Sequence, residues 1–120
     1  MTTKQNNFIL ISGRPASGKT QLLIAYANMY PQTTLVLSEE NSREDLHQRN
    51  LSKDIKVINS ELFQNVDISK YKTICIDYIE LFSDTFIKEK INPLIDTGIR
   101  IIILQQMDRK GRIRNNPFGE

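Results

Sequence analysis

One short segment near the start of the chain constrains the fold more than any other feature. It fits the pattern G-x-x-x-x-G-K-[ST] at every fixed position. An apolar run rich in β-formers precedes it at residues 8–11, and an uninterrupted helix-favouring segment follows at residues 20–29. Strand, loop and helix in this order are the context that the pattern requires. We therefore predict a phosphate-binding loop made of Gly13, Arg14, Pro15, Ala16, Ser17, Gly18, Lys19 and Thr20.

The residue types in this loop suit a nucleotide. Its two outer glycines allow backbone conformations that turn successive N–H groups inward, so the loop and the following helix N-terminus can surround phosphate oxygens. Lys19 is expected to reach the β- and γ-phosphates, and the Thr20 hydroxyl to bind Mg²⁺. ATP and Mg²⁺ are therefore the expected cofactors.

The composition is that of one ordinary globular domain. The chain has 120 residues, of which 39% are hydrophobic and 25% charged, with a net charge of +2. This length suits a single core and is too short for two. Cys75 is the only cysteine, which excludes an intrachain disulfide and a cysteine-rich zinc site. The polar start and the absence of a long apolar run favour a cytoplasmic protein without a membrane partner.

Strand-forming and helix-forming segments alternate along the chain. Short segments rich in β-formers predict strands at residues 8–11, 34–38, 56–59, 73–77 and 99–104. Most of them are almost continuously apolar, which is typical of parallel strands covered on both faces. We therefore predict a single α/β domain with a mostly parallel sheet of about five strands flanked by helices.

Two further helices are expected between these strands. Ser42 followed by Asp45 indicates an N-cap with an acid in the first turn, opening a polar helix over residues 43–50. A second helix is expected from about Glu80, because the apolar residues that follow are spaced for one face. Pro93 either kinks this helix or starts a last short segment, and Gly98 is expected to end the region.

Polar side chains follow several of the predicted strands. In such sheets ligands bind beyond the carboxyl ends of the strands. Asp77 ends one strand and is expected to hold Mg²⁺ opposite the loop. One of Glu39 and Glu40 is expected to activate the attacking water, and one of Gln105 and Gln106 to contact the γ-phosphate. The residues alone leave both choices open: the alternative is a solvated turn or a helix cap for the glutamates, and a polar loop for the glutamines.

The end of the chain is basic. We divide the chain into a nucleotide-binding core at residues 1–108 and a basic tail at residues 109–120. Three interpretations of the tail stay open: a solvated terminus, contact with nucleic-acid phosphates, or an arginine given to the ATP of a neighbouring subunit. The residues concerned are Arg109, Lys110, Arg112 and Arg114.

Four segments, taken in order, resemble the ATPase core of DnaB-type replicative helicases. GRPASGKT resembles the nucleotide-binding loop of that family, and LVLSEENSREDLHQR is similar to its strand ending in Ser-Leu-Glu-Met-Ser with the helix that follows. ICIDYIELF resembles its Asp-Tyr-Leu-Gln-Leu segment, and IIILQQMDR its Leu-Ser-Gln-Leu-Asn-Arg segment. The resemblance covers residues 8–109 and implies a RecA-like P-loop ATPase core.

Carried over by position, the resemblance implies a role for five residues. It makes Lys19 and Thr20 the phosphate and magnesium residues and Asp77 the Walker B acid. Glu40 becomes the catalytic glutamate, and Gln106 the sensor that contacts the γ-phosphate. The family's later strands, DNA-binding loop and arginine finger have no counterpart after the fourth motif. Slow hydrolysis is therefore expected, because an arginine finger can contribute about 10³- to 10⁵-fold in rate.

Three positions near the site depart from the family pattern. Glu39 stands in place of a leucine, Asn41 in place of a methionine, and Gln105 in place of a serine. The favoured function is a minimal RecA-like ATPase of DNA replication or recombination, with ATP and ADP, single-stranded DNA, and further copies or a replisome helicase as partners. A nucleotide-binding loader, regulator or inhibitor docked on a helicase is the alternative. A small P-loop kinase ranks last, because no arginine-rich lid segment is evident.

Overall fold

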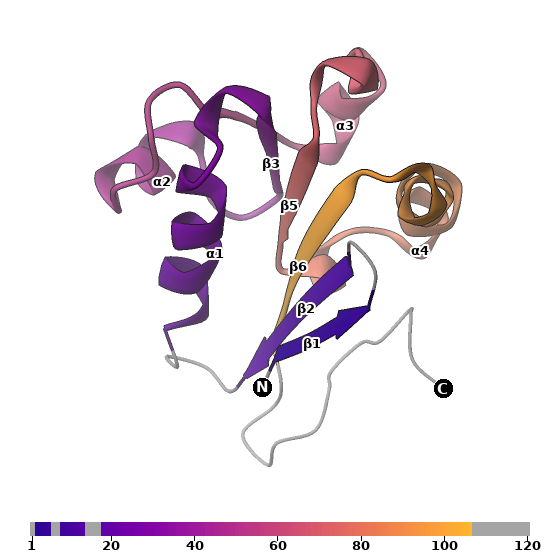
Figure 1. Ribbon diagram of the computed structural model, residues 1–120, viewed down its shortest axis with the longest axis horizontal. Coiled ribbons are helices and arrows are strands. Elements are labelled where there is room, and N and C mark those ends of the chain that lie inside the picture. The colour runs from indigo at the N-terminus through magenta and orange to yellow at the C-terminus, as the bar shows by residue number, and fades with distance from the viewer. Residues whose placement is uncertain (1, 6–7, 14–17, 107–120) are drawn as a thin grey trace.

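The strands of the computed structural model form one six-stranded sheet in the order β1-β2-β6-β5-β3-β4 (Figure 1). The structure describes residues 2–5, 8–13 and 18–106. The strands are β1 (Thr2–Gln5), β2 (Phe8–Gly13), β3 (Thr34–Ser38), β4 (Lys56–Ile58), β5 (Thr73–Asp77) and β6 (Arg100–Gln106). From β2 to β4 every neighbouring pair is parallel, and only β1 runs antiparallel, beside β2. The predicted α/β fold with a mostly parallel sheet of about five strands is confirmed.

The edge strand β1 has no counterpart among the predicted strands. Its sequence, TTKQ, contains no apolar residue, so it carries no alternation that could mark a strand. The pairing from Thr2 with Ile11 to Gln5 with Phe8 instead comes from the backbone of β2, which offers it a free edge.

Two of the helices begin where the sequence predicts. The helices are α1 (Lys19–Asn28), α2 (Arg43–Gln48), α3 (Ser60–Phe63) and α4 (Asp84–Phe86). At the start of α2 the Ser42 hydroxyl accepts a hydrogen bond from the Asp45 N–H at 3.1 Å, while the Asp45 carboxylate accepts one from the Ser42 N–H at 3.2 Å. This reciprocal capping explains why so polar a segment is helical.

The region from about Glu80 is helical but is not one continuous α-helix. The chain forms a 3₁₀ turn at Ile79–Leu81, then α4, a π-helical turn at Ile87–Ile91 and a 3₁₀ segment at Asn92–Thr97. Ser83 interrupts the first part, because its hydroxyl accepts the Phe86 N–H at 3.1 Å and starts a new helix there. Pro93 has no N–H to donate, and Gly98 ends the region with a φ of 91°.

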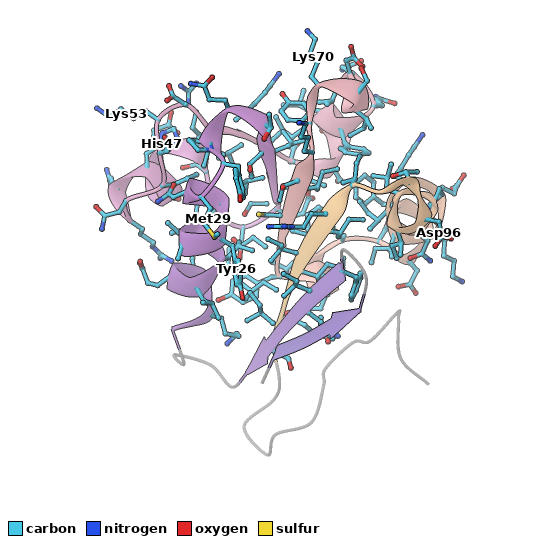
Figure 2. All side chains as sticks on the ribbon, in the orientation of Figure 1. Tyr26, Met29, His47, Lys53, Lys70 and Asp96 are labelled. Atoms are coloured by element: carbon cyan, nitrogen blue, oxygen red, sulfur yellow. The ribbon has the colours of Figure 1, made fainter. Side chains whose placement is uncertain are left out.

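Alternating side chains of the strands build a core on each face of the sheet. On the face covered by α1, Val36, Cys75 and Ile102 pack with Leu23 and with partly buried Tyr26, which is labelled in Figure 2. On the other face, the strands pack against α3 and the segments around α4, through Leu35, Leu37, Ile74, Ile76, Ile101, Ile103, Phe63, Ile79, Ile87 and Ile91. Figure 1 shows α1 and α4 on opposite sides of β5 and β6. Covering on both faces accounts for the nearly continuous apolar strands.

A helix that crosses a lipid bilayer must be both long and predominantly apolar. None of the described helices between residues 18 and 106 meets both requirements.

Candidate active site

The register of the sheet places the predicted polar residues at one edge. Ser12 pairs with Gln105 and Gly13 with Gln106 at the ends of β2 and β6, while Ser38 pairs with Asp77 at the ends of β3 and β5. Strand β6 lies between β2, which leads into the loop, and β5, which ends in Asp77. This edge is where ligands bind in parallel sheets.

The helix after the loop begins with the two residues expected to face phosphate. Gly18 precedes α1 with a φ of 81°, a left-handed conformation that glycine adopts without strain. Lys19 and Thr20 follow as the first helical residues and are both buried. Within the described α1, the first turn has no acidic residue and no side-chain cap, which leaves its N–H groups to a ligand or to the loop. The four residues between the glycines, Arg14, Pro15, Ala16 and Ser17, lie outside the described residues.

Lys19 is held in an unusual environment for a lysine. Its side chain is only 5% exposed, and this burial lowers its pKa, because loss of water disfavours the charged form. The carboxylate of Glu80 acts in the opposite direction and raises the Lys19 pKa. Glu80 belongs to the turn directly after β5, so the end of that strand supplies the lysine with a counter-charge. A phosphate bound in the loop would supply more.

Asp77 is fully buried and is held through one of its two oxygens. Its Oδ2 accepts hydrogen bonds from the Asn41 side-chain amide at 2.7 Å and from the Ser38 hydroxyl at 3.1 Å. The Ser38 hydroxyl in turn accepts the Asn41 N–H at 3.0 Å. We call these three residues the Asp77 cluster. Burial raises the Asp77 pKa, and the two hydrogen bonds partly offset that effect.

The other oxygen of Asp77 fits a cation ligand. Its Oδ1 is buried and has no hydrogen-bond partner among the described residues, which is costly for a carboxylate oxygen unless a ligand binds it. The next residue, Tyr78, shares a hydrogen bond of 3.4 Å with the Thr20 hydroxyl and so connects the start of α1 to the end of β5. A carboxylate and a hydroxyl oxygen at one strand edge are donors that Mg²⁺ accepts.

The structure separates the two adjacent glutamates. Glu39 accepts a 2.6 Å hydrogen bond from the N–H of Ser60, the first residue of α3, next to the N-cap residue Asn59. Glu40 is exposed, and its charge raises the Asp77 pKa, which places it electrostatically close to the Asp77 cluster. The two residues therefore have different neighbours, and of the two only the charge of Glu40 affects Asp77.

The two adjacent glutamines also differ. Gln105 is fully buried, and the alternation along β6 sets it with Ile101 and Ile103, on the face opposite the one that carries Cys75 and Asp77. That position is unsuited to contact with a phosphate near Asp77. The backbone of Gln106 pairs with Gly13, and its side chain lies outside the described part of the structure.

Four polar residues of the site have no role assigned from the sequence. Ser38, Asn41, Tyr78 and Glu80 are polar groups beside the ends of β3 and β5, and strand-end position was the signal that could have found them. Tyr78 adopts a φ of 56°, which is uncommon for a bulky residue and marks a turn held by its surroundings. The basic residues of the tail, Arg109, Lys110, Arg112 and Arg114, lie outside the described residues.

Comparison with known proteins gives a family. The model of the family described as DnaB-like helicase C-terminal domain matches residues 2–87, well over half of the chain. The matched range includes β2, α1, the Asp77 cluster and Glu80, and ends before β6. A search among curated proteins finds no match to the chain.

Proposed function

The chain belongs to the family of DnaB-like helicase C-terminal domains, and on that premise we propose that it binds ATP with Mg²⁺ and hydrolyses it. The family is one of helicase-related ATPase domains with a RecA-like fold that serve DNA replication. The observation that carries the proposal is the Asp77 cluster, which holds one carboxylate oxygen and leaves the other for a cation at the edge where α1 begins.

In this proposal the phosphates bind at the start of α1. The loop of residues 13–18 and the start of α1 surround them, and the Lys19 ammonium lies against the β- and γ-phosphates. The lowered pKa of Lys19 supports this assignment, because a buried cation is stabilised by an anion brought next to it.

Thr20 and Asp77 would hold the magnesium ion between them and the phosphates. When bound, Mg²⁺ neutralises charge on the transferred phosphoryl group. Asn41 and Ser38 keep the Asp77 carboxylate oriented for that ion, and Tyr78 positions the Thr20 hydroxyl in the absence of ligand.

Hydrolysis requires a water molecule to attack the γ-phosphorus. As the water oxygen bonds to phosphorus, the bond to the bridging oxygen breaks, ADP leaves, and the Glu40 carboxylate accepts the proton of the water. Glu40 suits this role because it is exposed beside the Asp77 cluster, while Glu39 is engaged with α3. Gln106 is assigned the contact with the γ-phosphate because Gln105 lies on the opposite face of β6.

The proposal extends to partners in DNA replication. Copies of the chain or a replisome helicase would supply an arginine to the bound ATP, and the basic residues Arg109, Lys110, Arg112 and Arg114 would contact single-stranded DNA. These assignments rest on charge and on the family, since the tail lies outside the described residues.

ATP turnover by the purified chain tests the proposal directly. We expect phosphate release that needs Mg²⁺, disappears in Lys19→Ala, and increases with single-stranded DNA or with assembly measured as mass in solution. A chain that binds no ATP analogue would refute the proposal at its first step. Tight ATP binding without turnover under any of these conditions would instead favour a nucleotide-binding accessory protein that docks on a helicase.

A further inference from the structure

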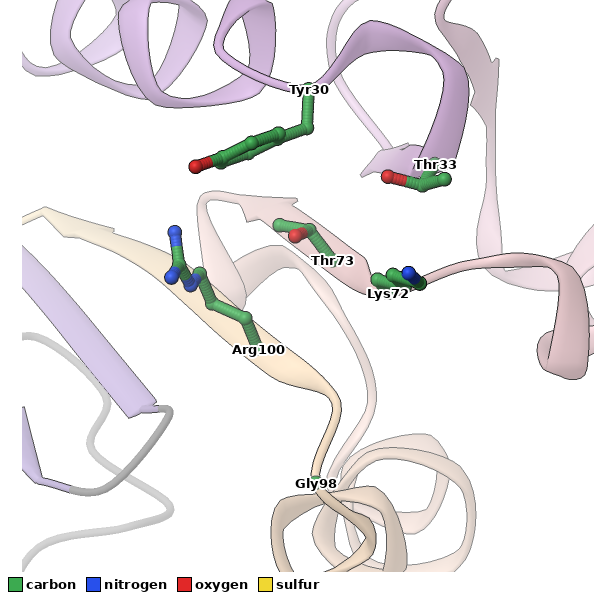
Figure 3. Close-up of a pocket in the computed structure, with 6 residues that line it drawn as sticks. All are labelled: Tyr30, Thr33, Lys72, Thr73, Gly98 and Arg100. Carbon is green, nitrogen blue, oxygen red and sulfur yellow. The ribbon is translucent and has the colours of Figure 1, made fainter.

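A pocket lies at the amino ends of the central strands, on the side of the sheet away from the candidate active site. This pocket, of about 420 Å³, opens where the chain leaves α1 and where β5 and β6 begin (Figure 3). Its lining residues are Tyr30, Thr33, Lys72, Thr73, Gly98 and Arg100. Thr73 begins β5 and Asp77 ends it, so the strand separates the two sites by about 13 Å, at roughly 3.3 Å for each residue. The pocket is therefore distinct from the candidate active site.

The charge in this pocket is positive. Lys72 and Arg100 line it, and none of the six lining residues is acidic. No carboxylate of the described residues forms an ion pair with either cation. The carboxyl end of α1 offers only about half a negative charge against these two full positive charges. The excess favours an anion.

One wall of the pocket is aromatic. The Arg100 guanidinium lies 5.9 Å from the centroid of the Tyr30 ring, and Figure 3 shows the two groups facing each other. The tyrosine is 53% exposed, so much of its side chain remains open to a ligand. Thr33 and Thr73 add hydroxyl groups to the lining. A flat ring, cations and hydroxyl donors together are the groups that bind a planar base and its phosphate.

We propose that this pocket binds a nucleotide unit, with the phosphate on Lys72 and Arg100 and the base against Tyr30. Arginine suits the phosphate because its planar fork can donate two parallel hydrogen bonds, while lysine adds a point charge. The volume falls within the range of small-ligand pockets. A free nucleoside monophosphate and one nucleotide of a single strand share this chemistry.

Binding is best tested in the Lys19→Ala chain, in which the candidate active site no longer contributes. The probes are thymidine monophosphate, followed by calorimetry, and a short fluorescein-labelled oligo(dT), followed by anisotropy. Replacing Lys72 and Arg100 by glutamine should weaken binding about tenfold for each cation removed. The matched control is Lys88→Gln with Lys90→Gln, which removes two exposed charges outside the pocket. Equal binding by the pocket variant and the control would overturn the proposal.

Two further variants complete the test: the first excludes misfolding as the cause of weaker binding, and the second tests whether Tyr30 stacks on the base. Lys72→Gln alone changes an exposed side chain, so it should fold and still lose about tenfold. Tyr30→Ala should weaken thymidine monophosphate binding and leave inorganic phosphate binding unchanged; equal effects on both would overturn the stacking role.

The two probes also distinguish the source of the nucleotide. Binding of the monophosphate that is lost in the pocket variant identifies a free ligand, while loss confined to oligo(dT) identifies a single strand; either supports the site. Binding of neither probe would overturn it. Because Lys19 is already replaced in this assay, its result is independent of whether the chain hydrolyses ATP.

Discussion

The side-chain amide of Asn41 donates a 2.7 Å hydrogen bond to Oδ2 of Asp77, joining the segment after β3 to the end of β5. A second bond, from the Ser38 hydroxyl at 3.1 Å, reaches the same oxygen. The carboxylate is thus fixed in orientation while Oδ1 is left without a hydrogen-bond partner among the described residues. One oxygen positions the acid, and the other is available to a cation.

Replacing Asn41 by alanine should weaken both the fold and the proposed magnesium site. Loss of a hydrogen bond to a carboxylate costs about 1.5 kcal/mol or more in the free energy of unfolding. Residues that orient a metal ligand affect affinity by about 10- to 100-fold, so the Mg²⁺ concentration for half-maximal ATP turnover should rise by that factor. Asn65→Ala, at an exposed position, is the control for both measurements. An unchanged Mg²⁺ requirement in Asn41→Ala would show that the amide does not position Asp77.

Asp77→Asn should stabilise the protein in a pH-dependent way. Burial raises the Asp77 pKa in the folded state, so the folded chain keeps this proton to higher pH than the unfolded chain. The associated stability is fully present below the unfolded pKa of about 3.9 and is lost as pH rises through the folded pKa. Asparagine carries no such charge. In urea denaturation without Mg²⁺ or nucleotide, the free energy of unfolding of the variant should increase relative to that of the parent as pH increases from about 4 to 8.

Asp67→Asn is the control with the opposite sign. Hydrogen bonds from Ser69 lower the Asp67 pKa, so its contribution to stability is present above the unfolded pKa and is lost as pH falls through the folded pKa. This variant should therefore lose stability relative to the parent at the higher pH. A gain by both variants, or by neither, would contradict the assignment of the Asp77 shift to burial.

The adjacent glutamates give a matched pair of variants. Glu40→Gln should keep ATP binding and lose turnover by about 10²-fold or more, because an amide cannot accept the proton of the attacking water. Glu39→Gln should keep turnover and lose about 0.5 to 1 kcal/mol of stability, because it weakens the 2.6 Å contact with the Ser60 N–H at the start of α3. Single-turnover hydrolysis and thermal denaturation separate the effects. The reverse pattern would transfer the catalytic role to Glu39.

Local patterns in the sequence were enough for most of the sheet. Strands β3 and β5 match their predicted bounds, because in each of them four consecutive residues suited to a covered parallel strand precede a polar last residue, Ser38 or Asp77. The spacing of apolar residues misled only after β5. There the apolar residues repeat at helical intervals, but the Ser83 side chain caps a new helix, and Pro93 has no N–H with which to continue that helix.

The site was predictable at strand ends and not beyond them. Asp77 stood out because it closes an apolar strand, but its bond to Asn41 spans 36 positions and depends on β3 lying next to β5 in the sheet. The same order of strands was needed to tell Glu39 from Glu40, since only the placement of α3 reveals which carboxylate is engaged. Contacts of this kind depend on the order of strands in the sheet, which a local sequence pattern does not predict.

Glu80→Gln should tighten ATP binding. The negative charge of Glu80 stabilises the charged form of Lys19 in the unliganded protein, and it would repel a phosphate that binds the same ammonium group. Because Glu80 is half-buried and screened by solvent, the expected gain in affinity is about two- to fivefold. Titration calorimetry with a non-hydrolysable ATP analogue measures it, with exposed Glu61→Gln as the control. Weaker binding in Glu80→Gln would mean that this carboxylate itself holds part of the ligand.

The single thiol should report on the opening of the sheet. Cys75 lies in the middle of β5 with no exposed surface, and burial raises its pKa to about 12. Only the thiolate attacks a disulfide reagent, so at about pH 8 the folded chain should not react, and one thiol should appear in denaturant. The residual native rate then measures transient opening of the central strands. It should rise in Asn41→Ala, which destabilises the end of β5, and stay at the parent level in Asn65→Ala. Rapid modification of the folded parent would contradict the buried position of Cys75.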